Sequence, residues 1–519
     1  MKMLKLEEMT LEQKIGHLIC ARGYRDEEDR AFILEMIKKG AVGGVQGICN
    51  GDFNCAVDAV ETADYPILVC ADMEGGVGDA VIPRPMGITA GGDPKVAYEL
   101  GRATAIEARR LGINLIWGPV VDLRKAVARS FSFDKDIASE YAIQMLKGYQ
   151  DEGLVCTAKH FVGAKDVGGD SHMKKVDSGR TLEELMKDEM VPYFRCMEEA
   201  NLSGIMTKHT LYKNIDDKYI VSLSKKMIDV IRSKGFDGLV VTDSLAMMGI
   251  VRDYGLVECL GLAIAAGNDM VLPNYRLTFK QSFDYLMKAY KEGVFSEERL
   301  NDAVRHVLAA QEKTLKKPSM THIDDKLKNI IEESWKNSVV AILKDGVSPA
   351  IKKDSKKFFA LFCENTYVGT EGFNAEIEMT ATFSRHSREI LKKQILEEFP
   401  DAKVMIISEW PNISEGQQLC VACSEADEVV FFTFAASGPY LGTNCITPRV
   451  EAQLEVNKEK IVAVVHNGNP FEINKFNDVE RIFTATAPER TNQYILKALK
   501  GEFVPKGKLT VDINESQYL

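Results

Sequence analysis

The 519-residue sequence lacks several features that mark whole classes of protein. Clear excess positive charge is one of them, because the formal net charge is -11. Nucleic acids and anionic membranes attract clustered positive charge, so we expect neither as a partner. No 18 residues in a row are apolar, and the first twenty residues lack the apolar stretch and cleavage site of a signal peptide. We therefore expect a cytoplasmic protein.

Paired cysteine motifs are also nearly absent. The eleven cysteines are scattered through apolar segments, which predicts reduced and mostly buried thiols. Cys420 and Cys423 form one CxxC, without a second pair or a histidine cluster nearby. This predicts a pair on a helix rather than a zinc or redox site, and we expect no metal or other cofactor.

The chain is longer than one hydrophobic core usually supports, which predicts two domains. Over residues 1–315, short apolar runs that end in polar residues alternate with amphipathic stretches, the pattern of successive strand and helix units. We expect eight strands, at 16–20, 41–46, 66–72, 113–122, 154–160, 203–209, 238–243 and 269–274. This pattern predicts an α/β fold that begins with a (β/α)8 TIM-like barrel, although an open doubly wound sheet fits it too.

A polar segment around Pro318 predicts a linker at 316–325. Residues 326–519 then show near-continuous apolar runs, typical of strands buried on both faces, between helical patterns. We expect a C-terminal α/β sandwich domain, with strands at 356–363, 402–408, 427–434 and 460–470.

Ionisable or amide side chains close many of the apolar runs in the first domain. Either architecture would bring them to one edge of the sheet, so they should share a pocket. These residues are Asp72, Asp122, Lys159, His160, Lys208, His209, Asp243 and Asn274.

Two of the ionisable residues invite a catalytic interpretation. Asp243 ends a run too apolar to be exposed, so its carboxylate needs partners or a task, but it could equally cap a following helix. His172 lies in a glycine-flanked loop two residues after Asp170, which could orient and polarise the imidazole. An isolated histidine is otherwise more often structural.

Four segments resemble glycoside hydrolase family 3, in its β-N-acetylglucosaminidase branch. The stretch KHFVGAKDVGGDSH at 159–172 is similar to the motif KHFPGHGDTxxDSH, with Val162, Ala164 and Lys165 as departures. DMEGG at 72–76, ARSFSFD at 128–134 and GFDGLVVTDSLAM at 235–247 resemble the family's D-x-E-G-G, R-S-F and nucleophile segments. Val77 stands where the family usually has arginine. The C-terminal half resembles the α/β sandwich domain of longer members.

The resemblance implies a retaining exo-β-N-acetylglucosaminidase acting on small glycosides. Asp243 would form a covalent glycosyl-enzyme, and His172, paired with Asp170, would be the acid/base. The glycines of the loop would act as hinges for that histidine. The hydroxyls of the terminal sugar would be bound by Asp72, Arg129, Lys159 and His160.

Several functional alternatives stay open. Phosphorolysis is the main one, because a neutral histidine would not repel inorganic phosphate as a carboxylate does. A β-glucosidase and a sugar-binding protein without activity are less favoured. The substrate would be a small oligosaccharide or amino-sugar glycoside, from cell-wall recycling or chitin breakdown, and formation of a homodimer stays open.

Overall fold

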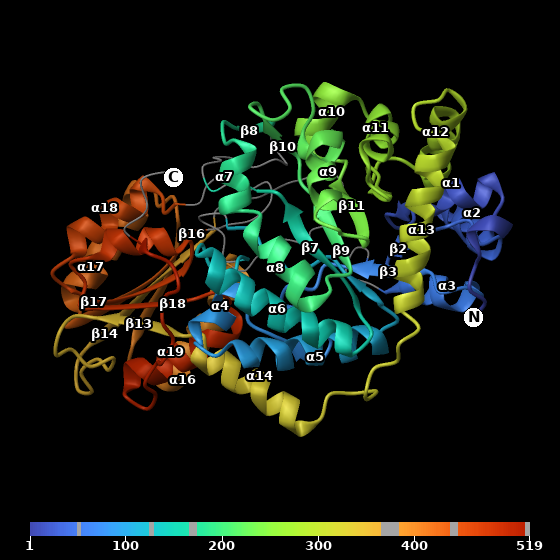
Figure 1. Ribbon diagram of the computed structural model, residues 1–519. Helices are drawn as coiled ribbons and strands as arrows, with labels where there is room; N and C mark the ends of the chain where they lie inside the picture. Colours follow the sequence, from blue (N-terminus) through green and yellow to red (C-terminus); the bar gives the residue numbers. More distant parts are fainter. Residues whose placement is uncertain are drawn as a thin grey trace. The chain divides into compact units, whose positions relative to one another are not determined.

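The computed structural model describes residues 1–48, 53–123, 129–163, 165, 174–364, 383–435 and 445–513 (Figure 1). The chain divides into two compact units. The first comprises Met1–Ile82, Pro94–Arg124 and Ser130–Ile331, and the second comprises Pro83–Asp93, Lys125–Arg129 and Glu332–Leu519. The domain boundaries at 315 and 326 stay a prediction.

The first unit is a (β/α)8 barrel. Eight parallel strands neighbour one another in chain order: β1 (Cys20–Ala21), β2 (Gly44–Gln46), β3 (Leu68–Ala71), β6 (Leu115–Ile116), β7 (Val155–Phe161), β9 (Gly204–Thr207), β11 (Leu239–Ser244) and β12 (Met270–Leu272). A bridge between Ile19 and Val271 joins the first strand to the last. The sheet therefore closes, which excludes the open doubly wound alternative and confirms the barrel.

Helices surround these strands (Figure 1). They are α1 (Leu11–His17), α2 (Glu27–Lys38), α3 (Asn54–Thr62), α5 (Pro94–Arg110), α6 (Lys135–Asp151), α7 (Leu182–Lys187), α8 (Val191–Ala200), α9 (Lys225–Ser233), α10 (Met248–Tyr254), α11 (Glu258–Ala266), α12 (Phe279–Lys291) and α13 (Glu297–Lys313). Short strand pairs add β4 (Gly76–Val77) with β5 (Ala80–Val81), and β8 (Val176–Ser178) with β10 (Thr210–Tyr212).

The first predicted strand was placed too early. Thr10 and Gln13 form a capping box that starts α1, and the helix runs to His17, so the strand begins only at Cys20. The apolar run GHLIC had suggested that the strand begins at residue 16. The capping box instead makes residues 11–17 helical and moves the start of the strand to Cys20.

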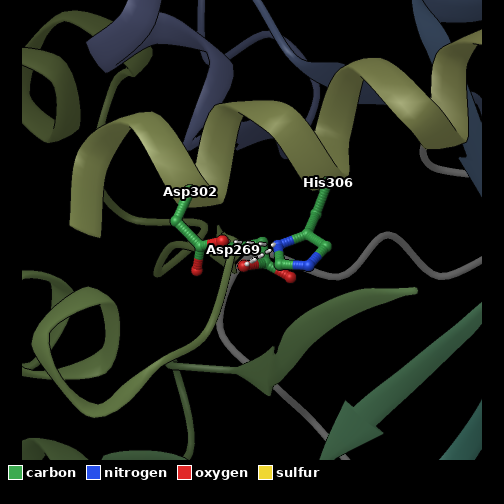
Figure 2. Close-up of side chains that lie close together, drawn as sticks. All are labelled: Asp269, Asp302 and His306. Carbon is green, nitrogen blue, oxygen red and sulfur yellow. Dashed lines mark hydrogen bonds and ion pairs between the residues drawn. The ribbon is translucent and has the colours of Figure 1, made fainter. Parts of the chain in front are cut away.

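Asp269 is the centre of a buried ion network at the amino end of β12, the end of the barrel opposite to the strands' carboxyl ends. One carboxylate oxygen lies 2.6 Å from Arg232 Nη2, and the other lies 2.5 Å from Arg299 Nη2 and 3.0 Å from His306 Nδ1. Asp302 and His306 lie one turn apart on α13 and face Asp269 (Figure 2). Burial raises the pKa of Asp269, but Arg232, His306 and Arg299 outweigh this and keep the pKa below its ordinary value.

We expect Asp269→Asn to cost about 3–5 kcal/mol of unfolding free energy, because it leaves two guanidinium groups without their buried countercharge. Asp302→Asn is the matched control, since that carboxylate is 39% exposed and its loss should cost less than about 1 kcal/mol. Because the Asp269 pKa is lowered, the stabilisation should be complete above the unfolded pKa of about 4 and be lost as the pH falls below it. Equal costs for the two variants in urea denaturation would contradict this role.

The second unit contains a six-stranded sheet in the order β13 (Val340–Leu343), β18 (Arg481–Ala485), β17 (Ile461–Gly468), β16 (Glu428–Ala435), β14 (Lys357–Cys363) and β15 (Lys403–Ser408). The four predicted strands are confirmed as β14, β15, β16 and β17. Two strands were missed: β13, an antiparallel edge strand of four residues, and β18, of five residues. Such short runs carry little periodicity in the sequence.

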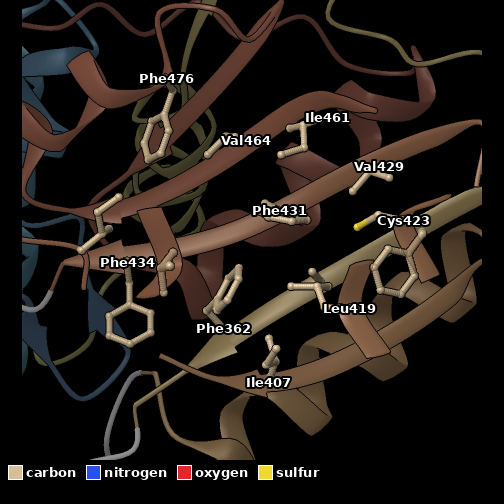
Figure 3. Packing of buried hydrophobic residues seen from close by; sticks show 14 of the residues in the cluster. Phe362, Ile407, Leu419, Cys423, Val429, Phe431, Phe434, Ile461, Val464 and Phe476 are labelled. Carbon is tan, nitrogen blue, oxygen red and sulfur yellow. The ribbon is translucent and has the colours of Figure 1, made fainter. Parts of the chain in front are cut away.

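Helices complete this α/β sandwich: α4 (Pro85–Ala90), α16 (Arg385–Glu398), α17 (Ile413–Glu425), α18 (Pro448–Asn457) and α19 (Pro488–Lys500). Helix α14 (Asp325–Asn337) begins within the residues of the first unit and ends within those of the second. Phe362 and Phe431 meet edge to face in the core between the sheet and α17 (Figure 3). The CxxC pair lies on α17 as predicted, with Cys423 buried. Among the residues with assigned positions, no helix is long and apolar enough to cross a membrane.

Candidate active site

Lys159 holds two carboxylates together at the carboxyl ends of the barrel strands. Its side chain is buried on β7, and Nζ lies 2.5 Å from Asp72 Oδ1 and 2.9 Å from Glu74 Oε1. The Asp72 side chain is 63% exposed, so one face of this carboxylate is open to a ligand. Glu74 was not predicted as a site residue, although it belongs to the DMEGG segment that carried the resemblance.

Asp122 gathers hydrogen-bond donors from several elements. Its Oδ1 accepts from the backbone N–H of His160 at 3.1 Å and from the Tyr193 hydroxyl at 3.3 Å. Its Oδ2 lies 2.8 Å from His160 Nδ1 and 3.6 Å from Lys208 Nζ. Asp122 was expected at this edge, but its central place was not predicted, because its partners His160, Tyr193 and Lys208 are far apart in the sequence.

Charge and burial set the protonation of this group. Burial alone would raise the pKa of the Asp122 carboxyl, but Lys208 and His160 hold it far below its ordinary value. Burial lowers the pKa of His160 below its ordinary 6.5, and the nearby Asp122 and Asp243 carboxylates only partly offset this. Asp122 is therefore ionised and His160 neutral at pH 7.

Asp243 lies at the end of β11 and keeps 18% of its side chain exposed. Its Oδ1 accepts from the backbone N–H of Ser244 at 2.7 Å, and its Oδ2 lies 3.9 Å from His160 Nε2. Burial raises the pKa of Asp243, but His160, His209 and the Ser244 N–H outweigh it, so the pKa stays below the ordinary 3.8. The alternative that Asp243 caps a helix is wrong, because α10 begins at Met248 and its N-cap is Met247.

His209 and Lys208 extend the site along the end of β9. His209 Nε2 donates to the Ser244 carbonyl at 3.0 Å, so its Nδ1 accepts from the Ser222 hydroxyl at 2.8 Å. Gly163 was expected to act as a hinge, but the structure gives a second reason for glycine. A Cβ there would lie 2.7 Å from Lys208 Nζ and 3.1 Å from Asp122 Oδ1.

The remaining predicted residues fall elsewhere. The Asn274 side chain accepts from the backbone N–H of Arg276 and so belongs to a local turn. Arg129 is half-buried and is grouped with the second compact unit. Asp170 and His172, together with the rest of 166–173, lie outside the described residues.

A metal does not fit the one cluster of suitable ligands found in the described part of the chain. That cluster is Asp269, Asp302 and His306 (Figure 2). Both Asp269 oxygens already bind guanidinium groups, and Asp302 pairs with Arg299 at 2.5 Å. Arg232 and Arg299 thus supply the positive charge that a cation would bring.

Comparison with known proteins gives one consistent family. The family model "Glycosyl hydrolase family 3 N terminal domain" matches residues 10–310. A β-hexosaminidase from Tolumonas auensis is 32% identical over 271 residues, which cover 50% of this chain and 74% of that protein. A β-N-acetylglucosaminidase/β-glucosidase from Cellulomonas fimi is 29% identical over 59% of this chain, and the chain spans only 58% of that relative.

Solved structures share the fold over nearly the whole length of the chain. A family 3 β-N-acetylglucosaminidase from a Paenibacillus species superimposes with a TM-score of 0.81 at 23% identity, covering 97% of this chain and 99% of that one. A β-glucoside phosphorylase gives a TM-score of 0.80 at 20% identity, with 99% and 95% covered. At these identities the likeness establishes the fold alone.

Proposed function

Since the chain belongs to glycosyl hydrolase family 3 and is a glycoside hydrolase, we propose that it is a retaining exo-β-N-acetylglucosaminidase that releases terminal N-acetylglucosamine from small glycosides. The observation that carries this proposal is the state of Asp243. An ionised and partly exposed carboxylate at a strand end, surrounded by groups that can bind hydroxyls, has the chemistry of a glycosidase nucleophile. The β-hexosaminidase relatives support the choice of sugar.

The proposed roles follow a double displacement. Asp243 attacks the anomeric carbon while His172, oriented by Asp170, protonates the departing oxygen. The same histidine then removes a proton from water, which releases the sugar from Asp243. His172 thus acts as a general acid in the first step and as a general base in the second.

Charge-assisted hydrogen bonds would orient the terminal sugar. The buried Lys159 pairs with the exposed carboxylate of Asp72, and His160 Nε2 lies 3.9 Å from Asp243 Oδ2. We propose that these three residues, with Arg129, bind the sugar hydroxyls. Ordinary ion pairing at a barrel mouth is the alternative for Lys159 and Arg129, and loss of binding without loss of stability in their alanine variants would argue against it.

Phosphorolysis is the second candidate, motivated by the phosphorylase fold neighbour. The clustered carboxylates Asp72, Glu74, Asp122 and Asp243 outnumber the two ammonium groups of Lys159 and Lys208. A net negative cluster repels phosphate dianion, which favours water as the acceptor. We therefore place hydrolysis first.

One assay separates the candidates. We expect the pure protein to release 4-nitrophenol from the 4-nitrophenyl N-acetylglucosaminide much faster than from the glucoside, and to give free sugar with or without phosphate. Formation of sugar 1-phosphate in phosphate buffer would establish the phosphorylase instead. Faster turnover of the glucoside would overturn the choice of sugar.

We further propose action in the cytoplasm on imported disaccharides, from cell-wall recycling or chitin breakdown. The support is limited to redox chemistry: all ten cysteines with described positions are free thiols, and eight of them are buried.

A further inference from the structure

We propose that Asp122 is a positioning residue that holds His160 in a single tautomer, with Nδ1 protonated and Nε2 presented toward Asp243 as a hydrogen-bond acceptor. The kinetic part of this inference rests on the proposed function, whereas the tautomer itself does not.

The geometry around Asp122 leaves one arrangement of protons. An ionised carboxylate can only accept hydrogen bonds, so His160 Nδ1, 2.8 Å from Oδ2, must carry a proton. The backbone N–H of the same residue donates to the other oxygen at 3.1 Å, so ring and backbone are held by one side chain. Two separate bonds therefore fix both the tautomer and the orientation of the ring.

The supporting donors keep Asp122 ionised. The Tyr193 hydroxyl lies 3.3 Å from Oδ1 and Lys208 Nζ lies 3.6 Å from Oδ2, and Asp122 itself is only 6% exposed. A carboxylate buried this deeply is stable only with partners of this kind. Gly163 allows the approach of Lys208, because a Cβ there would meet its ammonium group at 2.7 Å.

The unprotonated Nε2 of His160 bears on which groups of a ligand this site can bind. In the neutral ring Nε2 is an acceptor, and it lies 3.9 Å from Asp243 Oδ2, which is also an acceptor. The two atoms cannot bond to each other, so each can accept a hydrogen bond from a donor group of the ligand. The site therefore recognises a sugar that places a hydroxyl or amide N–H between His160 and the nucleophile.

The charges that face His160 give the arrangement a pH dependence. Asp122 and Asp243 raise the pKa of the ring, whereas Lys208 and burial lower it. Lys159, the preceding residue on β7, is neutralised by Asp72 and Glu74. Protonation of Nε2 removes the acceptor, so kcat/KM should fall as the pH drops through the His160 pKa.

Two variants should shift the acidic limb of the pH profile of kcat/KM, where kcat/KM falls with pH, in opposite directions. Asp122→Asn removes a negative charge, so the limb should shift to lower pH, and kcat/KM at neutral pH should fall about 10- to 100-fold as charge-assisted bonds are lost. Lys208→Met removes a positive charge, so the limb should shift to higher pH. Tyr193→Phe is the matched control at the same carboxylate, because it removes a neutral bond and keeps both charges. Its limb should stay within the error of wild type.

Nitrogen-15 NMR of histidine-labelled protein tests the tautomer without any substrate. We expect the wild type and Tyr193→Phe to show a protonated Nδ1 and a bare Nε2 for His160, assigned with His160→Gln, and Asp122→Asn to lose this pattern. A protonated Nε2 in the wild type would overturn the proposal even if every variant failed to fold. Shifts of the acidic limb in the same direction for Asp122→Asn and Lys208→Met would reduce Asp122 to a structural role. If the wild type shows the expected tautomer but is inactive on the glucosaminide, only the proposed function is contradicted.

Discussion

Replacing Asp243 with asparagine is expected to lower turnover by roughly 10⁴-fold or more while leaving the protein folded. Asparagine has nearly the same shape but cannot form the glycosyl ester on which double displacement depends. The side chain accepts a hydrogen bond from the Ser244 N–H through Oδ1, and the asparagine Oδ1 can accept the same bond. Turnover of a 4-nitrophenyl glycoside and urea denaturation should be measured on the same preparation.

Asp237→Asn is the matched control for this experiment. Asp237 precedes the same strand, β11, at its other end, and its side chain is 75% exposed. We expect this variant to keep its activity. Wild-type-like turnover in Asp243→Asn would end the assignment of the nucleophile, and a large loss of stability there would mean that the carboxylate supports the barrel.

Replacing His172 with alanine should slow hydrolysis of a disaccharide by about 10²–10⁴-fold, yet slow hydrolysis of a dinitrophenyl glycoside far less. A sugar oxygen is a basic leaving group that needs a proton, whereas dinitrophenolate departs without one. With the activated substrate the first step stays fast and the second loses its base. A glycosyl-enzyme should therefore accumulate, detectable as an added mass on the intact protein.

Asp170→Asn should show a milder form of the same pattern, because it removes only the group that orients and polarises the ring. Equal losses on good and poor leaving groups would contradict acid/base catalysis by His172 and leave it a positioning or structural role. Absence of the accumulated mass would argue that another residue activates water.

Local patterns in the sequence were enough to identify the eight strands of the barrel and much of the pocket's edge. The eight apolar runs of the barrel became β1, β2, β3, β6, β7, β9, β11 and β12, and the capping boxes at Thr10 and Thr181 start α1 and α7. These signals depend on residues within a few positions of one another. The short motifs around Asp72, Lys159 and Asp243 likewise carry the resemblance to the family in the sequence itself.

Tertiary structure alone decided how those parts meet. The bridge from Ile19 to Val271 closes the sheet across about 250 residues, and no local pattern encodes such a pairing. Buried charged groups then need polar or oppositely charged partners. Lys159 binds Glu74 as well as Asp72, and Asp122 contacts His160 on β7, Tyr193 on α8 and Lys208 at the end of β9. The same requirement, that a buried charge find its countercharge, built the Asp269 network at the opposite end of the barrel. The sequence by itself determined which residues end the strands. Long-range packing determined which of these residues bind one another and which remain exposed to a ligand.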